Sequence, residues 1–417
     1  MKFNRIVVTG MGALTPLGNS VDEYWKGLVS GVSGAAPITL FDASKFRTRF
    51  ACEVKNFEPT DFLDKKEARK IDRFSQFALV ASDQAMADAG LTKDNINPDR
   101  VGVILGSGIG GLTTFQQEVV NFAEGDGTPR FSPFFIPKMI LDMAPGHVAM
   151  RHNLRGPNYS TVSACASSTH AIINAFDALR LGKADIILTG GSEAVISEAG
   201  VGGFNAMKAM SERNDDPTTA SRPYDKDRDG FVMGEAGAIL VLETLEHALA
   251  RGAKIYCEVA GGGSTDDAYH ITAPHPEGLG AENVMYQALK DANMSIEDID
   301  YINTHGTSTP VGDMAEIKAI LNVFGEHAYK LNISSTKSMT GHCLGAAGVI
   351  EAIACIMSIN HGIVPPTINH FTDDVNLDPK LNMTFNKAQE RTVNAALSNT
   401  FGFGGHNACV IVKKFSE

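Results

Sequence analysis

The 417-residue sequence is poor in cysteine, and its six cysteines include no CxxC pair and no metal-ligand spacing. We therefore expect neither a disulfide framework nor a zinc site, but reduced thiols in a cytoplasmic protein. The chain also lacks an apolar run of about 18 residues, the length of a membrane-spanning helix. It leads at once into the apolar segment 6–10, which is too short for a signal peptide and typical of a buried strand.

The chain also has fewer basic than acidic residues. Lys and Arg number 36 against 48 Asp and Glu, which gives a formal net charge of -12 at pH 7. Non-specific binding to nucleic acid or to an anionic membrane surface depends on positive charge, so the composition predicts neither partner. An acidic protein partner would need a local basic patch on this chain.

The rest of the composition is that of a large folded chain. With 43% hydrophobic and 20% charged residues, it can form two ordinary domains or one unit built from two halves. Short β-branched runs alternate with Ala-rich amphipathic stretches, a pattern that predicts an α/β fold. The predicted strands are 101–105, 186–189, 239–242 and 410–412, and the predicted helices are 170–180 and 346–359. No Pro/Ser-rich linker separates the halves, so we expect them to pack closely.

A weak internal repeat supports a division into two halves. Residues 158–165, which end at Cys165, resemble residues 332–342, which end at His342, and each segment leads into a helix rich in small residues. If the halves are duplicated, Cys165 and His342 occupy loosely equivalent places near a helix start. A pseudo-twofold axis within the chain would then bring both side chains to one site.

Three segments rich in Gly, Ser and Thr carry a cysteine and two histidines: Cys165 in 163–168, His305 in 303–309 and His342 in 337–342. A cysteine can attack an acyl carbonyl and hold the acyl group as a thioester. Two neutral imidazoles can donate hydrogen bonds to an oxyanion that forms on a second substrate. The combination predicts thioester chemistry.

A single cysteine among small residues is more often a buried core thiol than a nucleophile. Cys165 differs because it follows the strand-like segment 159–163 and lies beside the start of a predicted helix. At such a start the helix dipole stabilises an anion by up to about 2 kcal/mol, roughly what a reactive thiolate requires at neutral pH. We therefore expect the dipole to lower the pKa of Cys165.

Two other interpretations remain open from the residues alone. Zinc could bind a Cys/His/His set, although these three lie far apart in the sequence and lack acidic neighbours of the kind that orient zinc ligands. Residues 106–111 match the GxGxxG pattern after a strand, but the next segment, 112–122, is predicted as a polar helix and not as a strand ending in an acidic residue. Tight turns and close backbone packing explain these glycines without a nucleotide. The sequence predicts no cofactor and no metal.

Together these segments resemble the β-ketoacyl-acyl-carrier-protein synthases, in particular the elongating enzymes of bacterial type II fatty acid synthesis. The resemblance covers essentially the whole chain and rests on the motifs around Cys165, His305 and His342 and on residues 399–407. It implies the thiolase-like fold, with two similar α/β halves in a five-layered α-β-α-β-α arrangement, and a homodimer. The halves would be residues 1–250, which carry Cys165, and residues 251–417, which carry both histidines.

The resemblance implies a decarboxylative Claisen condensation in fatty acid elongation. Cys165 would accept an acyl chain from an acyl carrier protein, after which malonyl-acyl-carrier protein would bind. His305 and His342 would hydrogen-bond the malonyl thioester carbonyl and stabilise the enolate left when CO2 departs, so that β-ketoacyl-acyl-carrier protein forms. Lys337, with Glu351 as its partner, would organise the site electrostatically. An ordinary structural ion pair is the alternative for these two residues.

The same resemblance assigns residues that bind the substrate. The backbone N–H groups of Cys165 and Phe403 correspond to an oxyanion hole, and Phe403 also corresponds to a gate on a glycine-flanked loop. Four further contacts are implied: Thr307 and Thr309 at the pantetheine arm, and Ile109 and Phe204 in the acyl pocket.

A basic segment supplies the patch that an acidic carrier protein would need. At helical spacing its five cations gather on one broad face: Lys65, Lys66, Arg69, Lys70 and Arg73. A solvated helix face is the alternative. Lys208 lies where the family has another basic docking residue. We therefore expect a carrier protein to dock at these positions.

Two positions depart from the family pattern. His406 stands where many relatives have Thr in the Gly-Gly-Thr-Asn motif, and Lys138 is a cation in the otherwise apolar stretch that begins at 134. These changes leave the preferred acyl chain length open. Alternatives with a related fold are a type I or secondary-metabolism ketosynthase and a non-catalytic chain-length factor, which lacks the nucleophile. A thiolase fits less well because it carries a cysteine where this chain has His342.

Overall fold

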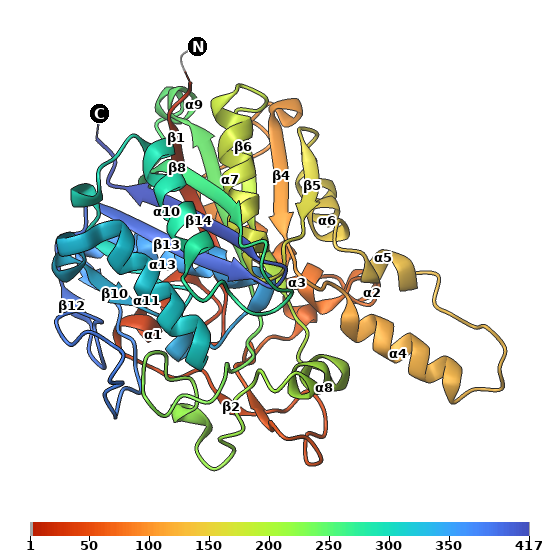
Figure 1. The fold of residues 1–417 in the computed structure, drawn as a ribbon. Helices are drawn as coiled ribbons and strands as arrows, with labels where there is room; N and C mark the ends of the chain where they lie inside the picture. The colour runs from red at the N-terminus through yellow and green to blue at the C-terminus, as the bar shows by residue number, and fades with distance from the viewer. Residues whose placement is uncertain (1–2, 417) are drawn as a thin grey trace.

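The computed structural model describes residues 3–416, in which ten strands form one continuous sheet with two halves in mirrored order (Figure 1). The order is β5-β4-β6-β7-β1 followed by β8-β14-β13-β9-β10, so β1 and β8 meet at the centre. The first half contains β1 (Ile6–Leu14), β4 (Val101–Gly106), β5 (Asn158–Thr161), β6 (Ile186–Glu193) and β7 (Ala236–Thr244). The second half contains β8 (Cys257–Asp266), β9 (Tyr301–Asn303), β10 (Asn332–Ser334), β13 (Ala395–Gly402) and β14 (His406–Lys413).

The two halves share one pairing pattern. β4 pairs in parallel with β5 and β6, as β9 does with β10 and β13, whereas the strands nearer the centre pair antiparallel. The halves join where Ile6, Val7 and Val8 pair with Val259, Glu258 and Cys257. The duplication predicted from the weak repeat is confirmed, because β5 and β10 take the same outer position in the two halves.

Helices form three layers, one on the outer face of each half of the sheet and one between the two halves. α3 (Arg73–Asp88) and α6 (Met143–His152) cover the outer face of the first half, and α10 (Leu279–Ala292) and α11 (Pro310–Phe324) cover that of the second. α7 (Ser167–Arg180) and α13 (Ala347–His361) pack against each other between the halves, and each contacts strands of both. The α/β class and the five-layered thiolase-like arrangement are confirmed.

The four strands and two helices predicted from composition are all present, in β4, β6, β7, β14, α7 and α13. The remaining helices are α1 (Val21–Val29), α2 (Lys65–Ala68), α4 (Leu112–Ala123), α5 (Phe135–Met139), α8 (Glu198–Ala206), α9 (Leu245–Ala250) and α12 (Lys337–Thr340). Two small sheets pair β2 (Ala36–Pro37) with β3 (Phe50–Ala51) and β11 (Ile363–Val364) with β12 (Gln389–Glu390).

The central helices approach closely where Gly348 of α13 meets Thr169 of α7. A Cβ atom on Gly348 would lie 1.9 Å from Oγ1 of Thr169. Ser168 accepts a hydrogen bond from the backbone N–H of Val349 at 3.1 Å, and the hydroxyls of Thr169 and Thr400 are 2.9 Å apart. Small side chains thus let α7 and α13 pack almost backbone to backbone, which fixes the segments that precede both helices.

Residues Leu344–His361 reach the length and apolarity of a membrane span, with a mean hydropathy of 1.4 over 18 residues. The expectation that no segment does so is wrong. The physical reason is that α13 has packing partners on all sides, and 89% of this stretch is buried inside the protein. A helix in a central layer is apolar around its whole circumference.

Both central helices begin after a 3-10 turn whose first residue has a left-handed backbone. These turns are Ala164–Ala166 and Leu344–Ala346, with φ 50 at Ala164 and φ 49 at Leu344. The equivalent of Cys165 in the second half is therefore Gly345, and His342 lies before the second turn. The repeat brings Cys165 and His342 to one site, but not in equivalent positions.

The loop that connects the two halves lies between α9, which ends at Ala250, and β8, which begins at Cys257. We propose the division expected from the sequence, residues 1–250 and 251–417, because the strands of one half all precede this loop and those of the other all follow it. Neither half closes its core alone, since α7 and α13 each pack on both.

The segment 112–122 forms a helix, as predicted, but part of its exposed surface is apolar. α4 projects from the body together with the loop that follows it (Figure 1). Three apolar side chains at helical spacing lie exposed on it: Phe115 at 44%, Val119 at 41% and Phe122 at 41%. Phe131, Phe134 and Ile136 extend this apolar surface beyond the helix. Exposed apolar patches of this kind are typical of interaction surfaces.

Candidate active site

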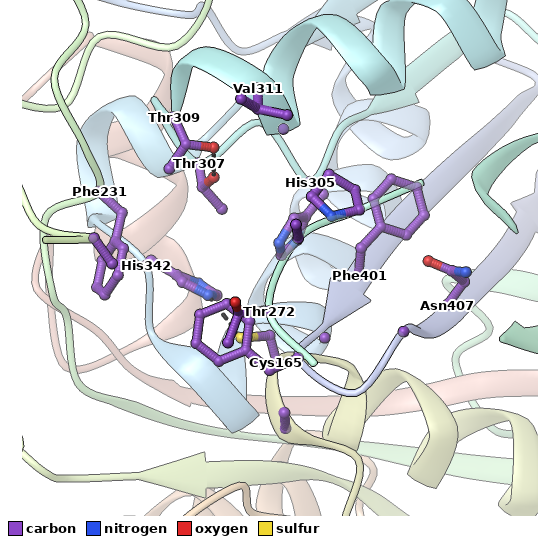
Figure 2. Close-up of a pocket in the computed structure, with 18 of the residues that line it drawn as sticks. Cys165, Phe231, Thr272, His305, Thr307, Thr309, Val311, His342, Phe401 and Asn407 are labelled. Carbon is purple, nitrogen blue, oxygen red and sulfur yellow. Dashed lines mark hydrogen bonds between the residues drawn. The ribbon is translucent and has the colours of Figure 1, made fainter. Parts of the chain in front are cut away.

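Cys165, His305 and His342 meet in one cavity between the two halves of the fold (Figure 2). Cys165 lies in the turn before α7, His305 follows β9 and His342 follows α12. Nε2 of His342 is 2.9 Å from Sγ of Cys165, and the ring centroids of the two histidines are 5.3 Å apart. The structure thus brings together the three residues on which the predicted chemistry depends.

The thiol of Cys165 is buried, and only 8% of the residue is exposed. Burial raises the pKa of Cys165 to about 12, although the charge of Lys337 and the backbone N–H groups of Phe403 and Cys165 oppose the rise. The expectation of a lowered pKa is wrong, because desolvation outweighs the groups that favour the thiolate. Cys165 is therefore an unionised thiol beside His342.

Both imidazoles are neutral at physiological pH. Burial, above all, lowers the pKa of His305 and of His342 well below the usual value, and the positive charge of Lys337 lowers both further. Nδ1 of each ring has no hydrogen-bond partner among residues 3–416. No partner at Nδ1 therefore fixes the tautomer of either ring. The proton of His305 is free to lie on Nε2, whereas Nε2 of His342 faces the Cys165 thiol and is the acceptor of its proton until that thiol is acylated.

Lys337 and Glu351 form an ion pair in the core, with each side chain 1% exposed. Burial raises the pKa of Glu351 to about 7, and Lys337 opposes this rise. The pair expected from the sequence is present, and it joins the start of α12 to α13 on either side of His342. Its position explains how one cation acts on the pKa values of Cys165 and both histidines.

Glu316 holds the His305 segment and was not expected from the sequence. Its carboxylate accepts hydrogen bonds from the backbone N–H groups of His305 and Gly306, each at 2.9 Å. Burial raises the pKa of Glu316 to about 7. One sequence signal could have found it. Glu316 is an acidic residue on the helix that begins directly after Thr309, so it lies close to the loop that carries His305.

Phe403 lies on the loop between β13 and β14, and this loop packs directly on the cysteine turn. A Cβ atom on Gly402 would meet the backbone nitrogen of Cys165 at 3.2 Å. The glycines at 404 and 405 have φ 93 and 85, which side chains rarely allow. The ring of Phe403 is 6.4 Å from that of Phe204. The loop therefore contacts the cysteine turn at Gly402 and an apolar residue through Phe403, and two glycines with left-handed backbones follow directly.

The cavity has a volume of about 460 Å³ and reaches every substrate contact implied by the resemblance. Its apolar lining includes Ile109, Phe204, Met207, Phe231 and Leu344. Thr307 and Thr309 also line it, with their hydroxyl oxygens 3.0 Å apart, and Figure 2 shows them beside Val311. An apolar chain and a polar arm can both be accommodated here.

The expected docking face loses one of its five cations. Lys65, Lys66, Arg69 and Lys70 are exposed on α2 and just after it, and Lys208 is exposed just after α8. Arg73 instead pairs with the fully buried Glu235 at 2.6 Å. The expectation of one continuous helical face is wrong because α2 ends at Ala68 and α3 begins at Arg73, which turns Arg73 into the core.

The two positions that depart from the family pattern lie outside the catalytic contacts. His406 is 43% exposed at the start of β14, with Nδ1 3.5 Å from Oδ2 of Asp266. Lys138 is partly exposed in α5. The positive charge of Lys138 acts on Asp72, because burial raises the pKa of that carboxyl and Lys138 opposes the rise.

The GxGxxG segment binds a carboxylate of the protein itself. The backbone N–H groups of Gly108, Ile109 and Gly110 donate to Glu193 over 2.7 to 3.2 Å. These are the groups that would hold a phosphate in a dinucleotide site, so that interpretation loses its support. Among residues 3–416, no cluster of three or more His, Cys, Asp and Glu side chains is arranged to hold a metal ion.

Two family models match the chain in succession. That of the β-ketoacyl synthase N-terminal domain matches residues 3–248, and that of the C-terminal domain matches residues 256–371. The chain belongs to the β-ketoacyl synthase family. Members of this family are acyltransferases, which agrees with a cysteine and two histidines in one cavity.

Relatives of this β-ketoacyl synthase extend over its full length. The chain is 51% identical to 3-oxoacyl-acyl-carrier-protein synthase 2 of Synechocystis sp., over 100% of this chain and 99% of that protein. It is 50% identical to the Staphylococcus aureus protein of the same name, over 99% and 98%. Among solved structures, a β-ketoacyl synthase from Burkholderia phymatum has a TM-score of 0.92 at 35% identity, covering 99% of this chain and 100% of that one. The ishigamide ketosynthase/chain length factor has a TM-score of 0.92 at 36% identity with the same coverage.

Alkylation of Cys165 by iodoacetamide tests the protonation state of the thiol. Because burial raises the pKa of Cys165 to about 12, the thiolate fraction grows about tenfold per pH unit in the neutral range. The rate, followed by intact-protein mass spectrometry against a Cys165→Ala control, is expected to rise about 100-fold from pH 7 to pH 9. A plateau near pH 8 would contradict this and show a thiol with an ordinary or lowered pKa.

Proposed function

We propose that this chain condenses malonyl-acyl-carrier protein with an acyl chain held as a thioester on Cys165, releasing CO2 and β-ketoacyl-acyl-carrier protein in fatty acid elongation. The observation that carries the proposal is the contact between Cys165 and His342, with His305 beside them in one cavity. Relatives named for this reaction are 50 to 51% identical over essentially the whole chain.

The first half-reaction loads the acyl group. Sγ of Cys165 attacks the acyl thioester carbonyl of the carrier protein, and the oxyanion is received by the backbone N–H groups of Cys165 and Phe403, which also act on the sulfur of Cys165. The C–S bond to the pantetheine arm then breaks. The thiol proton has an acceptor in Nε2 of His342, 2.9 Å away, from which it passes to the departing pantetheine sulfur. A thiol with a raised pKa needs such a partner.

The second half-reaction uses the two histidines as hydrogen-bond donors. The malonyl carboxylate leaves as CO2, and its electron pair becomes an enolate whose oxygen faces His305 and His342. His305 with its proton on Nε2 stabilises that oxyanion, and His342 joins it once its proton has moved from Nδ1, where loading leaves it, to Nε2. Loss of such a donor typically costs about 2.7–4 kcal/mol. The carbanion attacks the acyl carbonyl on Cys165, the C–S bond breaks, and the Cys165 thiolate takes up a proton from water. The steps use groups of the chain, two thioesters and water, without a cofactor.

Two alternatives are weaker. A chain-length factor lacks the nucleophile, whereas Cys165 is present here in hydrogen-bond distance of His342. A secondary-metabolism ketosynthase would share the catalytic residues, but a solved type II polyketide ketosynthase bound to its acyl carrier protein is only 32% identical to this chain. The higher identity to the fatty acid enzymes favours elongation. The six buried free thiols fit a cytoplasmic protein.

An acyl-transfer assay tests the proposed reaction. Incubation with long-chain acyl-acyl-carrier protein is expected to add one acyl mass to the wild-type protein and none to Cys165→Ala, as read by intact-protein mass spectrometry. Malonyl-acyl-carrier protein should then discharge the adduct as a β-ketoacyl product. Absence of an adduct with every chain length would rule out the condensing mechanism and favour a non-catalytic partner.

We propose that acyl carrier protein docks on the exposed cations of α2 and Lys208. An acidic partner requires such a patch, because the chain as a whole is negative. Lys66→Glu combined with Lys70→Glu is expected to raise the KM for acyl-carrier protein about tenfold or more, with a smaller change in kcat and a loss of salt dependence. The matched control is Lys93→Glu with Lys183→Glu, two exposed lysines elsewhere. Equal effects of the two pairs would refute docking at α2.

We also propose a homodimer in which a second copy covers β5 and the exposed row of α4. β5 is the outer strand of its half. β10, the corresponding outer strand, is covered by residues 382–384 through a hydrogen bond from Ile333 to Asn382 at 2.9 Å, and no strand of residues 3–416 covers β5 in this way. Association with a second copy would cover both the unpaired edge of β5 and the exposed apolar row of α4.

Sedimentation of charged variants tests the homodimer. The wild-type protein is expected to sediment at twice the 44.5 kDa of one chain. Phe115→Glu with Val119→Glu places charge in the apolar row and is expected to yield a monomer, because burial of two unpaired carboxylates is unfavourable. Gln117→Glu, on the same helix but outside the row, should remain a dimer. A wild-type monomer, or a dimer that survives the double change, would refute the proposed surface.

A further inference from the structure

Glu193 is a fully buried carboxylate at the end of β6 that the proposed mechanism does not use. Among residues 3–416, no Lys, Arg or His forms an ion pair with it. Its two oxygens instead accept hydrogen bonds from backbone and hydroxyl donors on two different halves of the fold. A buried charge without a counter-ion persists only where several oriented donors replace its hydration.

One set of donors comes from the loop after β4. Oε1 accepts from the hydroxyl of Ser107 at 3.0 Å and from the backbone N–H of Gly110 at 3.0 Å. Oε2 accepts from the backbone N–H of Gly108 at 2.7 Å, and the N–H of Ile109 lies 3.2 Å from both oxygens. The carboxylate therefore holds the backbone of Ile109, whose side chain lines the cavity.

The other donor comes from the second half, just after His342. The backbone N–H of Gly345 donates to Oε2 of Glu193 at 3.1 Å. A Cβ atom on Gly345 would lie 2.6 Å from that oxygen and 2.3 Å from the backbone nitrogen of Gly108. The His342 segment and the Ile109 loop thus touch each other only because glycine stands at both points, with Glu193 between them.

The cysteine turn belongs to the same cluster. A Cβ atom on Gly108 would meet the carbonyl oxygen of Ala164 at 3.1 Å, next to Cys165. The negative charge of Glu193 also contributes to the raised pKa of Cys165. Two segments therefore bind the carboxylate directly, the acyl-pocket wall and the segment after His342, and the cysteine turn packs against the first of them at Gly108.

We propose that Glu193 is a positioning residue that fixes the acyl-pocket wall at Ile109 and the His342 segment together, so that acyl loading and malonyl decarboxylation depend on the same carboxylate. The inference rests on the roles proposed above for these residues. A carboxylate is required because both of its oxygens receive hydrogen bonds. In Glu193→Gln, either orientation of the amide turns an NH2 group toward at least two N–H or O–H donors.

The test measures the two half-reactions separately in the full-length protein. Glu193→Gln is expected to lower the rate of acyl loading from a long-chain acyl-carrier protein about tenfold or more, and more for long than for short chains. It is expected to lower CO2 release from malonyl-acyl-carrier protein, measured without an acyl donor, by about the same factor, because displacement of a catalytic segment by about 1 Å costs up to about 100-fold. The pH profile of Cys165 alkylation should move toward lower pH when the charge of Glu193 is removed.

Glu243→Gln is the matched control. Glu243 is also fully buried in the strand next to β6, where it accepts hydrogen bonds from Thr9 and Arg251, and it does not line the cavity. The Glu243→Gln variant measures the general cost of removing a buried carboxylate. The rates of both half-reactions in the folded variant should stay within about twofold of the wild-type rates. The inference would be overturned if the rates in Glu193→Gln fell no further than in this control. It would also be overturned if the rate of only one half-reaction fell.

A second variant covers the case in which Glu193→Gln does not fold. Ser107→Ala keeps the carboxylate and removes one hydroxyl donor from Oε1, and it is expected to slow long-chain loading about threefold. Unchanged loading in Ser107→Ala would then overturn the inference. Failure of the wild-type protein in both half-reactions is a separate result, which would overturn the proposed function itself.

Discussion

The close crossing of α7 and α13 is the contact on which the rest of the structure depends. Gly348 leaves no room for a side chain against Thr169, so the two helices meet with their backbones near each other and the halves of the sheet close on both sides. Each helix is preceded by a turn with one left-handed residue, which costs about 1–2 kcal/mol. The packing behind the turns sustains that strain and aims Cys165 and the His342 segment at one cavity.

Burial then sets the electrostatics of the site. It keeps the thiol of Cys165 protonated and the two imidazoles neutral, while the single cation among them, Lys337, is matched by Glu351. The site therefore works through proton position and hydrogen-bond donation rather than through a standing thiolate. Glu316 and Glu193 serve the same arrangement differently, because each uses its charge to hold backbone N–H groups of a catalytic loop.

Much of the fold and site could be predicted because the relevant signals are local. Glycine and hydroxyl residues frame Cys165, His305 and His342, and alternation of short strands with helices identifies the fold class. The pKa of Cys165 could not be predicted, since it depends on how deeply the turn is buried. Arg73 required knowledge of where α2 ends, and Glu193 required the partners of its carboxylate, which come from two segments far apart in the chain.

The place of α13 in the central layer governs the order in which the chain can fold. The first half leaves the ribosome with the inner face of α7 complete, but the helix that covers it follows only after β8, β9 and β10 have been made. Until then a small-residue groove shaped to receive another helix stands open. The nascent first half is therefore exposed to association with other apolar helices until residues 347–361 emerge.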